Sequence, residues 1–396
     1  MKVYVVGIGM DGRKTLTAEA ENAIGKADVL IGAKRMTEPF AALGKQVFEC
    51  WKTDDICAFL GQCGHGTAAV LMSGDCGFFS GARLLEKRLS GCDAEIIPGI
   101  STPVYMCAKL GLSWHDMKFV SLHGAQGNIV RSVCGNRKCF FLLGGGITPA
   151  DICKRLCEYG MGDTAVHIGA RLSYPDEQLI SGTAAELSEV QCAGLCALIT
   201  ENAAPERNVR TGIPDEEFTR GDVPMTKSEV RAAVASKLNV CYNDTVWDIG
   251  CGTGSVSVEC ALAANEGTVC AVDKNEAAVK LTVSNARKFG CDNIHALCGA
   301  APEILRELPR PDKVFIGGAG GNIAGILGSA LSPGGSQKAV ITAVTLETLN
   351  EAAAAFREHR ISPEITQISV TRTRIIGGHT MLNAQNPVFI IAGERT

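Results

Sequence analysis

The stretch Val246–Gly254 constrains the fold of this chain more than any other part of the sequence. Residues 246–249 form a short apolar run with one acid, which predicts a buried strand, and glycines follow at positions 250, 252 and 254. Residues 255–264 then have the apolar spacing of a helix. A strand, a glycine turn and a helix in succession let a ligand approach the backbone closely, because glycine carries no side chain. We therefore expect a ligand site at this turn.

The next expected strand, 268–273, narrows the kind of ligand. It ends in Asp273, where an acid can accept hydrogen bonds from two ribose hydroxyls. The turn reads Gly-x-Gly-x-Gly, whereas nicotinamide-binding proteins have Gly-x-Gly-x-x-Gly. Together these features predict a site for S-adenosylmethionine (SAM). A dinucleotide site and a tight turn with a purely structural role are the alternatives.

Length and charge limit the class of protein. The chain has 396 residues, enough for two or three domains. Its net charge of -4 gives no general attraction to nucleic acid or to an anionic membrane. We find no apolar run of membrane-spanning length, and the N-terminus runs directly into a strand pattern, which does not fit a signal peptide. These observations predict a compact cytoplasmic enzyme with neither a nucleic acid nor a membrane as partner.

The 18 cysteines are scattered singly, with no histidine or cysteine partners at zinc spacing. In a cytoplasmic chain such cysteines are reduced and act as small buried hydrophobic residues. We therefore expect no metal site and no disulfide.

The first half of the chain repeats a strand, a glycine-bearing loop and a helix. Residues 2–7 predict a strand that ends in a second glycine turn, and residues 15–27 predict the helix that follows. Further short apolar strands are expected at 29–31, 70–72, 95–97, 118–122 and 139–143. This pattern predicts an α/β domain whose ligands bind at the carboxyl ends of the strands. Residues 165–168 and 195–200 predict strands of a following subdomain.

The rhythm breaks between residues 200 and 225, which contain three prolines. We place a linker at 202–212 and predict two domains, 1–205 and 213–396. The second domain is expected to open with a helix over 226–237, with Thr226 as N-cap and Glu229 completing a capping box. Its predicted strands are 246–249, 268–273, 294–298, 313–316 and 338–342, followed by a terminal pair at 364–371 and 388–392. This is a doubly wound, seven-stranded pattern.

Three motifs give the first half a family resemblance. Residues 5–9 (VVGIG), 71–80 (LMSGDCGFFS) and 97–101 (IPGIS) resemble the tetrapyrrole methylase family. The resemblance implies a two-subdomain α/β fold. Cys76 stands where the family has a proline after Ser-Gly-Asp, and Met10-Asp11 replaces a glycine-proline pair. The SAM-binding residues implied by this resemblance are Gly9, Gly74, Asp75, Ser101 and Thr102.

The second half resembles class I SAM-dependent methyltransferases, and more narrowly the cobalt-precorrin-6B C15-methyltransferases. The matching stretches are 213–218 (IPDEEF), 223–227 (VPMTK), 248–254 (DIGCGTG), 317–321 (GGAGG) and 340–343 (VITA). The resemblance implies a doubly wound, Rossmann-like fold. Ala300 stands where many relatives have an acid near the adenine. The implied SAM-binding residues are Thr226, Gly250, Cys251, Gly252, Thr253, Gly254, Asp273 and Ala301.

The two halves in this order resemble fused, decarboxylating precorrin C5,C15-methyltransferases. The resemblance implies two SAM sites, one per domain, and a precorrin or cobalt-precorrin as substrate in cobalamin biosynthesis. It also implies methylation at C5 and C15, loss of the C12 acetate carboxyl group as carbon dioxide, and a homo-oligomer. The ring carbon is enamine-like and already nucleophilic, so that positioning matters more than a strong base. We assign no catalytic residue.

A substrate with many carboxylates directs attention to basic residues near each turn. For each of these, a solvated charge or a structural hydrogen bond is the alternative role. Two other functions stay open. One is methylation of tRNA or protein, although the net negative charge of the chain disfavours tRNA. The other is a scaffold that binds SAM or tetrapyrrole without catalysis. The basic candidates are Arg35, Arg83, His123, Arg171, Lys227, Arg231, Arg372, Arg374 and His379.

Overall fold

The computed structural model describes residues 1–10, 12–62, 66–89, 91–122, 127–206, 210–318, 320–331 and 338–395. Contacts divide the chain into two units, which we describe separately. Unit 1 comprises Met1–Gln126, Arg137–Lys154 and Asp163–Ala203, and unit 2 comprises Gly127–Asn136, Arg155–Gly162 and Ala204–Thr396. Two short segments from the first half of the chain therefore belong to unit 2.

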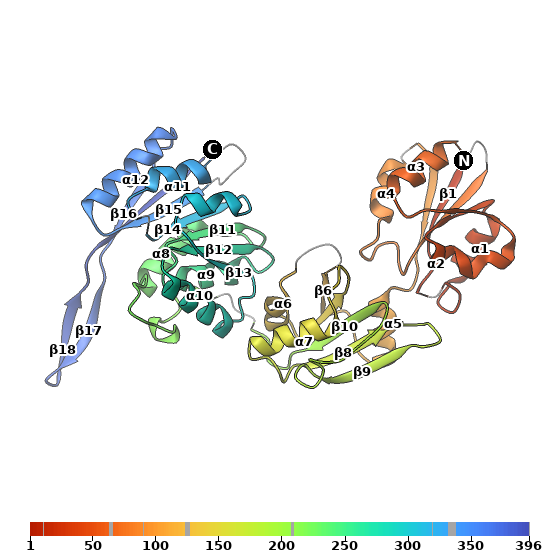
Figure 1. Ribbon diagram of the computed structural model, residues 1–396, viewed down its shortest axis with the longest axis horizontal. Coiled ribbons are helices and arrows are strands. Elements are labelled where there is room, and N and C mark those ends of the chain that lie inside the picture. Colours follow the sequence, from red (N-terminus) through yellow and green to blue (C-terminus); the bar gives the residue numbers. More distant parts are fainter. Residues whose placement is uncertain are drawn as a thin grey trace. The chain divides into compact units, whose positions relative to one another are not determined.

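A parallel five-stranded sheet opens unit 1, in the order β3-β2-β4-β1-β5. After a polar first residue, its central strands are largely apolar and buried, as expected for a sheet buried on both faces. One face packs against α1, and the other packs against α3 and α4 (Figure 1). The elements are β1 (Lys2–Gly7), α1 (Ala18–Lys26), β2 (Val29–Gly32), α2 (Lys34–Thr37), β3 (Gln46–Glu49), α3 (Thr53–Gln62), β4 (Thr67–Met72), α4 (Ala82–Arg88), β5 (Asp93–Ile97) and α5 (Thr102–Leu110).

The second sheet of unit 1 is mixed, in the order β6-β7-β10-β8-β9. Our grouping of 118–122 and 139–143 with the first sheet was wrong, because both strands belong here. A short apolar strand has the same sequence pattern in either sheet, and the residues near it do not indicate which strand it pairs with. We did not predict β3 or β9, whose side chains are largely exposed. The strands are β6 (Met117–Ser121), β7 (Lys138–Leu142), β8 (Ala165–Ala170), β9 (Gln178–Thr183) and β10 (Cys196–Glu201).

Unit 2 contains a seven-stranded sheet in the order β13-β12-β11-β14-β15-β19-β16, which confirms the doubly wound prediction. Strands β13 to β15 in this order are parallel, and β19 and β16 are antiparallel to their neighbours. The strand order reverses between β11 and β14, and ligands bind at such a switch point. The strands are β11 (Thr245–Ile249), β12 (Thr268–Asp273), β13 (Ile294–Cys298), β14 (Lys313–Ile316), β15 (Lys338–Ala343), β16 (Glu364–Ile368) and β19 (Val388–Glu394).

The first helix of this unit begins later than we expected. Lys227, not Thr226, is the N-cap of α8, and no side chain caps it. The capping-box prediction was therefore wrong, because the Glu229 carboxylate pairs with Arg372 instead. The helices that flank the sheet are α8 (Ser228–Leu238), α9 (Ser255–Ala263), α10 (Glu276–Lys288), α11 (Ile323–Ala330) and α12 (Leu346–Glu358).

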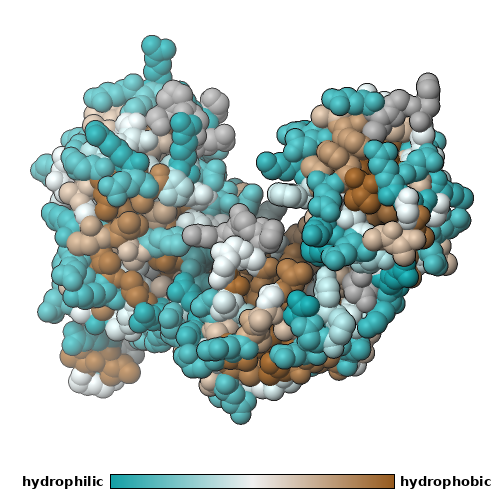
Figure 2. Space-filling view, turned by 45° about the vertical axis from the view of Figure 1, so that its right-hand side comes forward, coloured by the Kyte–Doolittle hydropathy of each residue, from teal (hydrophilic) through white to brown (hydrophobic). Residues whose placement is uncertain are grey.

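A two-stranded arm interrupts the terminal strand pair. Strands β17 (Thr371–Ile376) and β18 (His379–Ala384) pair with each other and project from the sheet (Figure 1). We had expected one strand over 364–371. The apolar side chains of the β17–β18 arm are exposed, up to 78% for Ile375. The arm therefore lacks the alternation of buried and exposed residues by which a strand is recognised in a sequence. These side chains form the brown area at the lower left of Figure 2.

Helix α6 (Ile129–Gly135) packs within unit 2, although it precedes the expected linker. The Asp292 carboxylate accepts hydrogen bonds from the amides of Val130 (2.8 Å) and Arg131 (3.0 Å), which caps the start of the helix. Helix α7 (Pro149–Glu158) follows β7. Within the described residues, none of the helices combines the length and the apolar character that a membrane crossing requires.

Candidate active sites

The glycine turn after β11 leaves no room for side chains. Gly250, Gly252 and Gly254 have φ angles of +76°, +56° and +75°. A Cβ atom on Gly250 would lie 2.6 Å from the backbone nitrogen of Gly318, and one on Gly252 would lie 2.7 Å from the Pro224 carbonyl oxygen. Both distances are far below van der Waals contact, so the turn brings bare backbone to the end of the sheet.

Asp273 holds this turn in place from the end of β12. Its Oδ2 accepts the amide of Gly252 at 3.0 Å, and its Oδ1 accepts the amide of Asn275 at 2.9 Å. An ionised carboxylate offers about four lone-pair positions, so each oxygen retains capacity for another donor. The carboxylate can therefore fix the loop and still bind a pair of hydroxyl groups.

A cavity of about 510 Å³ opens over the turn. The predicted residues Thr226, Gly250, Cys251, Gly252, Asp273 and Ala301 all line it. Thr253 and Gly254 lie behind the lining: the Thr253 carbonyl accepts a hydrogen bond from Asn285 (2.8 Å), and Gly254 is the N-cap of α9. Sequence reasoning missed Val223, Pro224, Lys274, Asn275 and Asn322, which also line the cavity.

One buried thiol and one buried carboxyl group underlie the turn. Burial raises the pKa of the Cys251 thiol and outweighs the opposite effect of the Thr282 hydroxyl, which donates to its sulfur at 3.3 Å, so the thiol stays protonated and is no nucleophile. Asp248 is fully buried, and the hydroxyl of Ser257 donates to it. Burial raises the pKa of the Asp248 carboxyl to about 7.

The glycine turn of unit 1 is built by a bridge between two loops. The amide of Gly9 donates to the Gly74 carbonyl at 3.1 Å, and the amide of Gly74 donates to the Gly9 carbonyl at 2.6 Å. Ser101 is the N-cap of α5, which Thr102 begins. A cavity of about 240 Å³ is lined by Gly74, Asp75 and Thr102, with Gly9 and Ser101 directly behind. The structure thus brings all five predicted residues together.

Asp75 and Cys76 stabilise that turn. The Asp75 carboxylate accepts the amides of Gly77 (2.8 Å) and Gly99 (3.0 Å). The Cys76 thiol is buried and lies 3.5 Å from the carbonyl oxygens of Val5 and Ile97. Burial raises its pKa to about 12. A cysteine therefore fits where the tetrapyrrole methylase motif has proline.

Strained backbone gathers beside this cavity. Phe79, Arg171 and Ser173 are not glycines, yet their φ angles are +46°, +48° and +74°. Such conformations cost of order 1–3 kcal/mol and concentrate at functional sites. Phe79 and Tyr174 line the cavity. No local signal in the sequence reveals this strain, because tertiary packing imposes it.

The basic candidates of unit 1 differ in position. Arg35 lines the smaller cavity, and its Nη1 donates to the Ser73 hydroxyl at 3.3 Å. Arg171 pairs with Asp176 at 2.5 Å, and its guanidinium lies 4.9 Å from the ring centre of Tyr174. Arg83 is exposed on α4 and does not line this cavity, and His123 lies outside the described residues.

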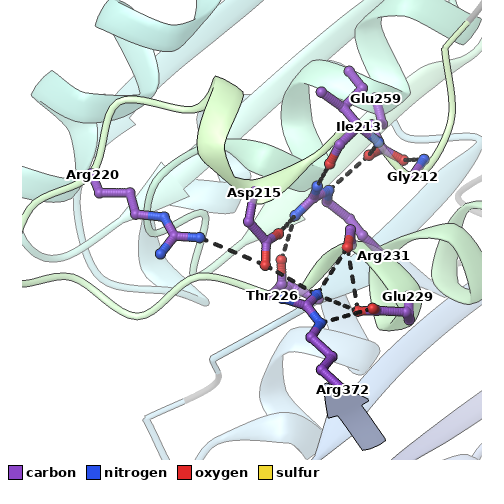
Figure 3. Close-up of polar contacts among 10 residues, drawn as sticks. Gly212, Ile213, Asp215, Arg220, Thr226, Glu229, Arg231, Glu259 and Arg372 are labelled. Carbon is purple, nitrogen blue, oxygen red and sulfur yellow. Dashed lines mark hydrogen bonds and ion pairs between the residues drawn. The ribbon is translucent and has the colours of Figure 1, made fainter. Parts of the chain in front are cut away.

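In unit 2, the expectation that Arg231 binds substrate was wrong. Its side chain is completely buried, where it pairs with Asp215 (3.2 Å) and Glu259 (2.7 Å) (Figure 3). Arg372 pairs with Glu229 at the same cluster. Lys227 stands at the N-cap position of α8, and the remaining candidates, Arg374 and His379, are exposed on the β17–β18 arm. Among the described residues, no cluster of three or more histidines, cysteines or acids has the arrangement of a metal site.

Two family models match the chain. Residues 2–188 match the tetrapyrrole (corrin/porphyrin) methylases, and residues 216–395 match the precorrin methyltransferase domain.

Three individual proteins illustrate the similarity. A probable cobalt-precorrin-6B C(15)-methyltransferase (decarboxylating) from Pyrobaculum calidifontis is 47% identical over 46% of this chain and 94% of its own length. A precorrin-6Y C(5,15)-methyltransferase [decarboxylating] from Sinorhizobium sp is 29% identical over 97% of this chain and 94% of its own length. A crystal structure of precorrin-6y C5,15-methyltransferase from Geobacter metallireducens GS-15 is 35% identical, covers 47% of this chain and 97% of that chain, and has a TM-score of 0.44.

Proposed function

Because the chain belongs to the precorrin methyltransferase family, we propose that it methylates a precorrin at C5 and C15 and decarboxylates the C12 acetate in cobalamin biosynthesis. The observation that carries this proposal is the pair of glycine-turn cavities, one in each unit, each lined by an aspartate whose carboxylate accepts loop amides. The match of a relative over 97% of the chain supports a combined activity. The domains proposed are 1–205 for C5 and 213–396 for C15 and decarboxylation.

The residues around the larger cavity fit SAM. Asp273 keeps acceptor capacity on both oxygens, which suits the two hydroxyl groups of a ribose. Gly250 and Gly252 leave backbone where any Cβ would collide, so the methionine part of the cofactor can lie against the turn. Thr226 and Ala301 would contact the cofactor from the cavity walls. When bound, SAM would supply an electrophilic methyl group.

The residues around the smaller cavity would bind a second SAM molecule and contact part of a macrocycle. Gly9, Gly74, Ser101 and Thr102 would bind the cofactor chiefly through their backbone, because the Asp75 carboxylate already accepts two loop amides. The aromatic rings of Phe79 and Tyr174 line the same cavity and suit a flat apolar ligand. Arg35 would meet an acidic side chain of the substrate.

The chain's own contribution to the reaction is positioning. The enamine-like ring carbon needs alignment with the methyl donor and exclusion of water, which can supply a large part of the rate enhancement. Decarboxylation needs the acetate to be held where its electrons can enter the ring, with hydrogen bonds to stabilise the charge that develops. The backbone of Gly317 and Gly318 beside the turn lets a bulky ring approach closely.

Product mass tests the proposal. The full chain, given SAM and a precorrin-6B-type substrate, is expected to add two methyl groups and to release one carbon dioxide per macrocycle. The Asp273→Ala variant should retain one methylation and lose the other together with decarboxylation. An unchanged product pattern in this variant would contradict the assignment of C15 methylation to residues 213–396. We also propose a homo-oligomer, and size-exclusion chromatography with light scattering tests its molar mass.

A methyltransferase for tRNA or protein is the second candidate. The SAM-type turn is the one observation that supports it, because such a turn binds the methyl donor whatever molecule accepts the methyl group. Net charge -4 disfavours tRNA, because nucleic-acid binding relies on basic surfaces. Transfer of labelled methyl groups to tRNA or protein, with none to the macrocycle, would replace the first proposal by this one. A non-catalytic scaffold would transfer label to none of them.

A further inference from the structure

One wall of the larger cavity has no regular secondary structure. Residues 219–227 lie in neither a helix nor a strand, yet Val223, Pro224 and Thr226 line the cavity. Asn285 fixes one end of this segment, since its Oδ1 accepts the amide of Thr219 (2.8 Å) and its Nδ2 donates to the Thr219 carbonyl (3.0 Å). We call residues 219–227 the cavity wall. Without ladder hydrogen bonds, its order depends on such individual contacts.

Arg231 fixes the other end of the cavity wall. Its Nη1 donates to the Thr226 carbonyl, and its side chain is completely buried. Two buried carboxylates balance its charge: Asp215 at 3.2 Å and Glu259 at 2.7 Å. Removing Arg231 would take away the ion-pair partner of the buried Glu259 and one cationic partner of the buried Asp215, which would strongly destabilise the unit. Arg231 is therefore necessary to the fold, and its variants cannot report on the wall alone.

Arg372 joins this cluster from the base of the arm (Figure 3). Its Nε donates to Glu229 Oε1 at 2.9 Å, and its Nη2 reaches the Ser228 hydroxyl at 3.1 Å and Asp215 Oδ2 at 3.4 Å. Asp215 is thus shared by Arg372 and Arg231, with Arg220 a further 3.6 Å contact. A chain of contacts leads from the arm through Asp215 and Arg231 to Thr226 in the wall.

We propose that Arg372 is a positioning residue for cofactor binding, which holds the cavity wall against the glycine turn through Asp215 and Arg231. Without Arg372, Asp215 loses one of its three cationic partners and is drawn toward the other two. The guanidinium of Arg231 then shifts with Asp215 and weakens its hydrogen bond to the Thr226 carbonyl. The inference rests on the proposed cofactor site, because it concerns the affinity of that site.

Arg372 suits a test because its removal should leave the fold intact. About a third of its side chain is exposed (34%), as is 41% of Glu229. Exposed pairs of this kind contribute little to overall stability. Lys237 provides a matched control: it lies at the other end of α8, and its ammonium group pairs with Glu364 of β16. Arg372→Gln and Lys237→Gln each remove one positive charge between α8 and the C-terminal strands.

Hydrogen–deuterium exchange of the full chain, read by mass spectrometry, measures the order of the wall directly. In Arg372→Gln we expect the amides of residues 219–227 to exchange about ten times faster than in the unmodified chain. Protection of this segment by S-adenosylhomocysteine should require a concentration about three to ten times higher. Lys237→Gln should match the unmodified chain in both measurements.

Two results would overturn the inference: an unchanged exchange rate of the wall in Arg372→Gln, or an equal acceleration in Lys237→Gln. Failure of the proposed cofactor site has a different signature. In that case S-adenosylhomocysteine would leave the amides of residues 250–254 unprotected in the unmodified chain. The exchange of the wall in the absence of ligand would still decide whether Arg372 orders it.

Discussion

The two cavities share one device and differ in their walls. In each, an aspartate beside a glycine turn accepts hydrogen bonds from two loop amides. This aspartate is Asp273 in unit 2 and Asp75 in unit 1. The larger cavity has the polar neighbours Lys274, Asn275 and Asn322, whereas the smaller one has aromatic and aliphatic walls that include Phe79. A glycine turn with an acid therefore marks the ligand-binding edge, and the walls determine which part of a ligand is recognised there.

The groups buried beneath the two turns differ as well. In unit 2 the buried Asp248 directly precedes the glycine turn, and in unit 1 the buried Cys76 directly follows the turn residues Gly74 and Asp75. Burial raises both pKa values, that of Asp248 to about 7 and that of Cys76 to about 12. Between pH 4 and pH 8 only the carboxyl of this pair titrates, so the two turns should respond differently to pH.

The largest expected effect is a pH-dependent loss of stability in unit 2. Between its ordinary pKa of 3.8 and about 7, Asp248 holds a proton that the unfolded chain has released. Stability therefore falls as pH rises through this window, by about 4 kcal/mol in total. Urea unfolding followed by tryptophan fluorescence at several pH values should show this slope. Asp248→Asn should flatten it, whereas Cys76→Ala should leave it unchanged; an equal slope in all three would contradict the assignment.

The next largest effect is a difference between the roles of the two aspartates, one in cofactor affinity and the other in stability. Asp273→Ala removes acceptors that can meet two ribose hydroxyls, and we expect the affinity of one site for S-adenosylhomocysteine to fall about 10- to 100-fold. Asp75→Ala should chiefly lower the unfolding temperature, because its carboxylate holds the amides of Gly77 and Gly99. Isothermal titration and thermal unfolding of both variants test this contrast. Similar losses of affinity in both would show that the aspartates play one role.

A smaller effect concerns the aromatic wall of unit 1. Phe79→Gly and Phe79→Ala both remove the ring, and we expect kcat/KM for C5 methylation to fall about 10-fold in each, as for the loss of one stacking contact. Because φ at this residue is +46°, the glycine variant should be more stable than the alanine variant by about 1 kcal/mol. Trp51→Ala, which removes an exposed ring outside the cavity, serves as the control. Unchanged kinetics in both Phe79 variants would remove this residue from the substrate site.

The sequence predicted the parts of the molecule that local rules determine. Strands 268–273, 294–298 and 313–316 occur with the expected bounds, because each is a short, mostly apolar run between turn residues. Within each unit, the predicted turn residues also come together, because the carboxyl ends of parallel strands lie at one edge of the sheet.

Long-range contacts set the rest. The exposed β17–β18 arm has no buried face to impose a periodicity, and Arg231 looks like any helical arginine until Asp215 and Glu259 surround it. Glu229 stands at a capping-box spacing, but Arg372, 143 residues away, competes for its carboxylate. The positive φ of Phe79 likewise depends on packing that no nearby residue encodes.

The smallest effect expected is the response of the two turns to thiol reagents. Cys76 and Cys251 are both buried, and burial raises both pKa values, so neither forms the reactive thiolate at pH 8. Cys241 and Cys298 are exposed and should react first with iodoacetamide. Peptide mapping after brief alkylation should find label on the exposed pair, with the affinity for S-adenosylhomocysteine unchanged. Early labelling of Cys251 would mean that the turn of unit 2 opens to solvent, whereas labelling of Cys76 alone would place that opening in unit 1.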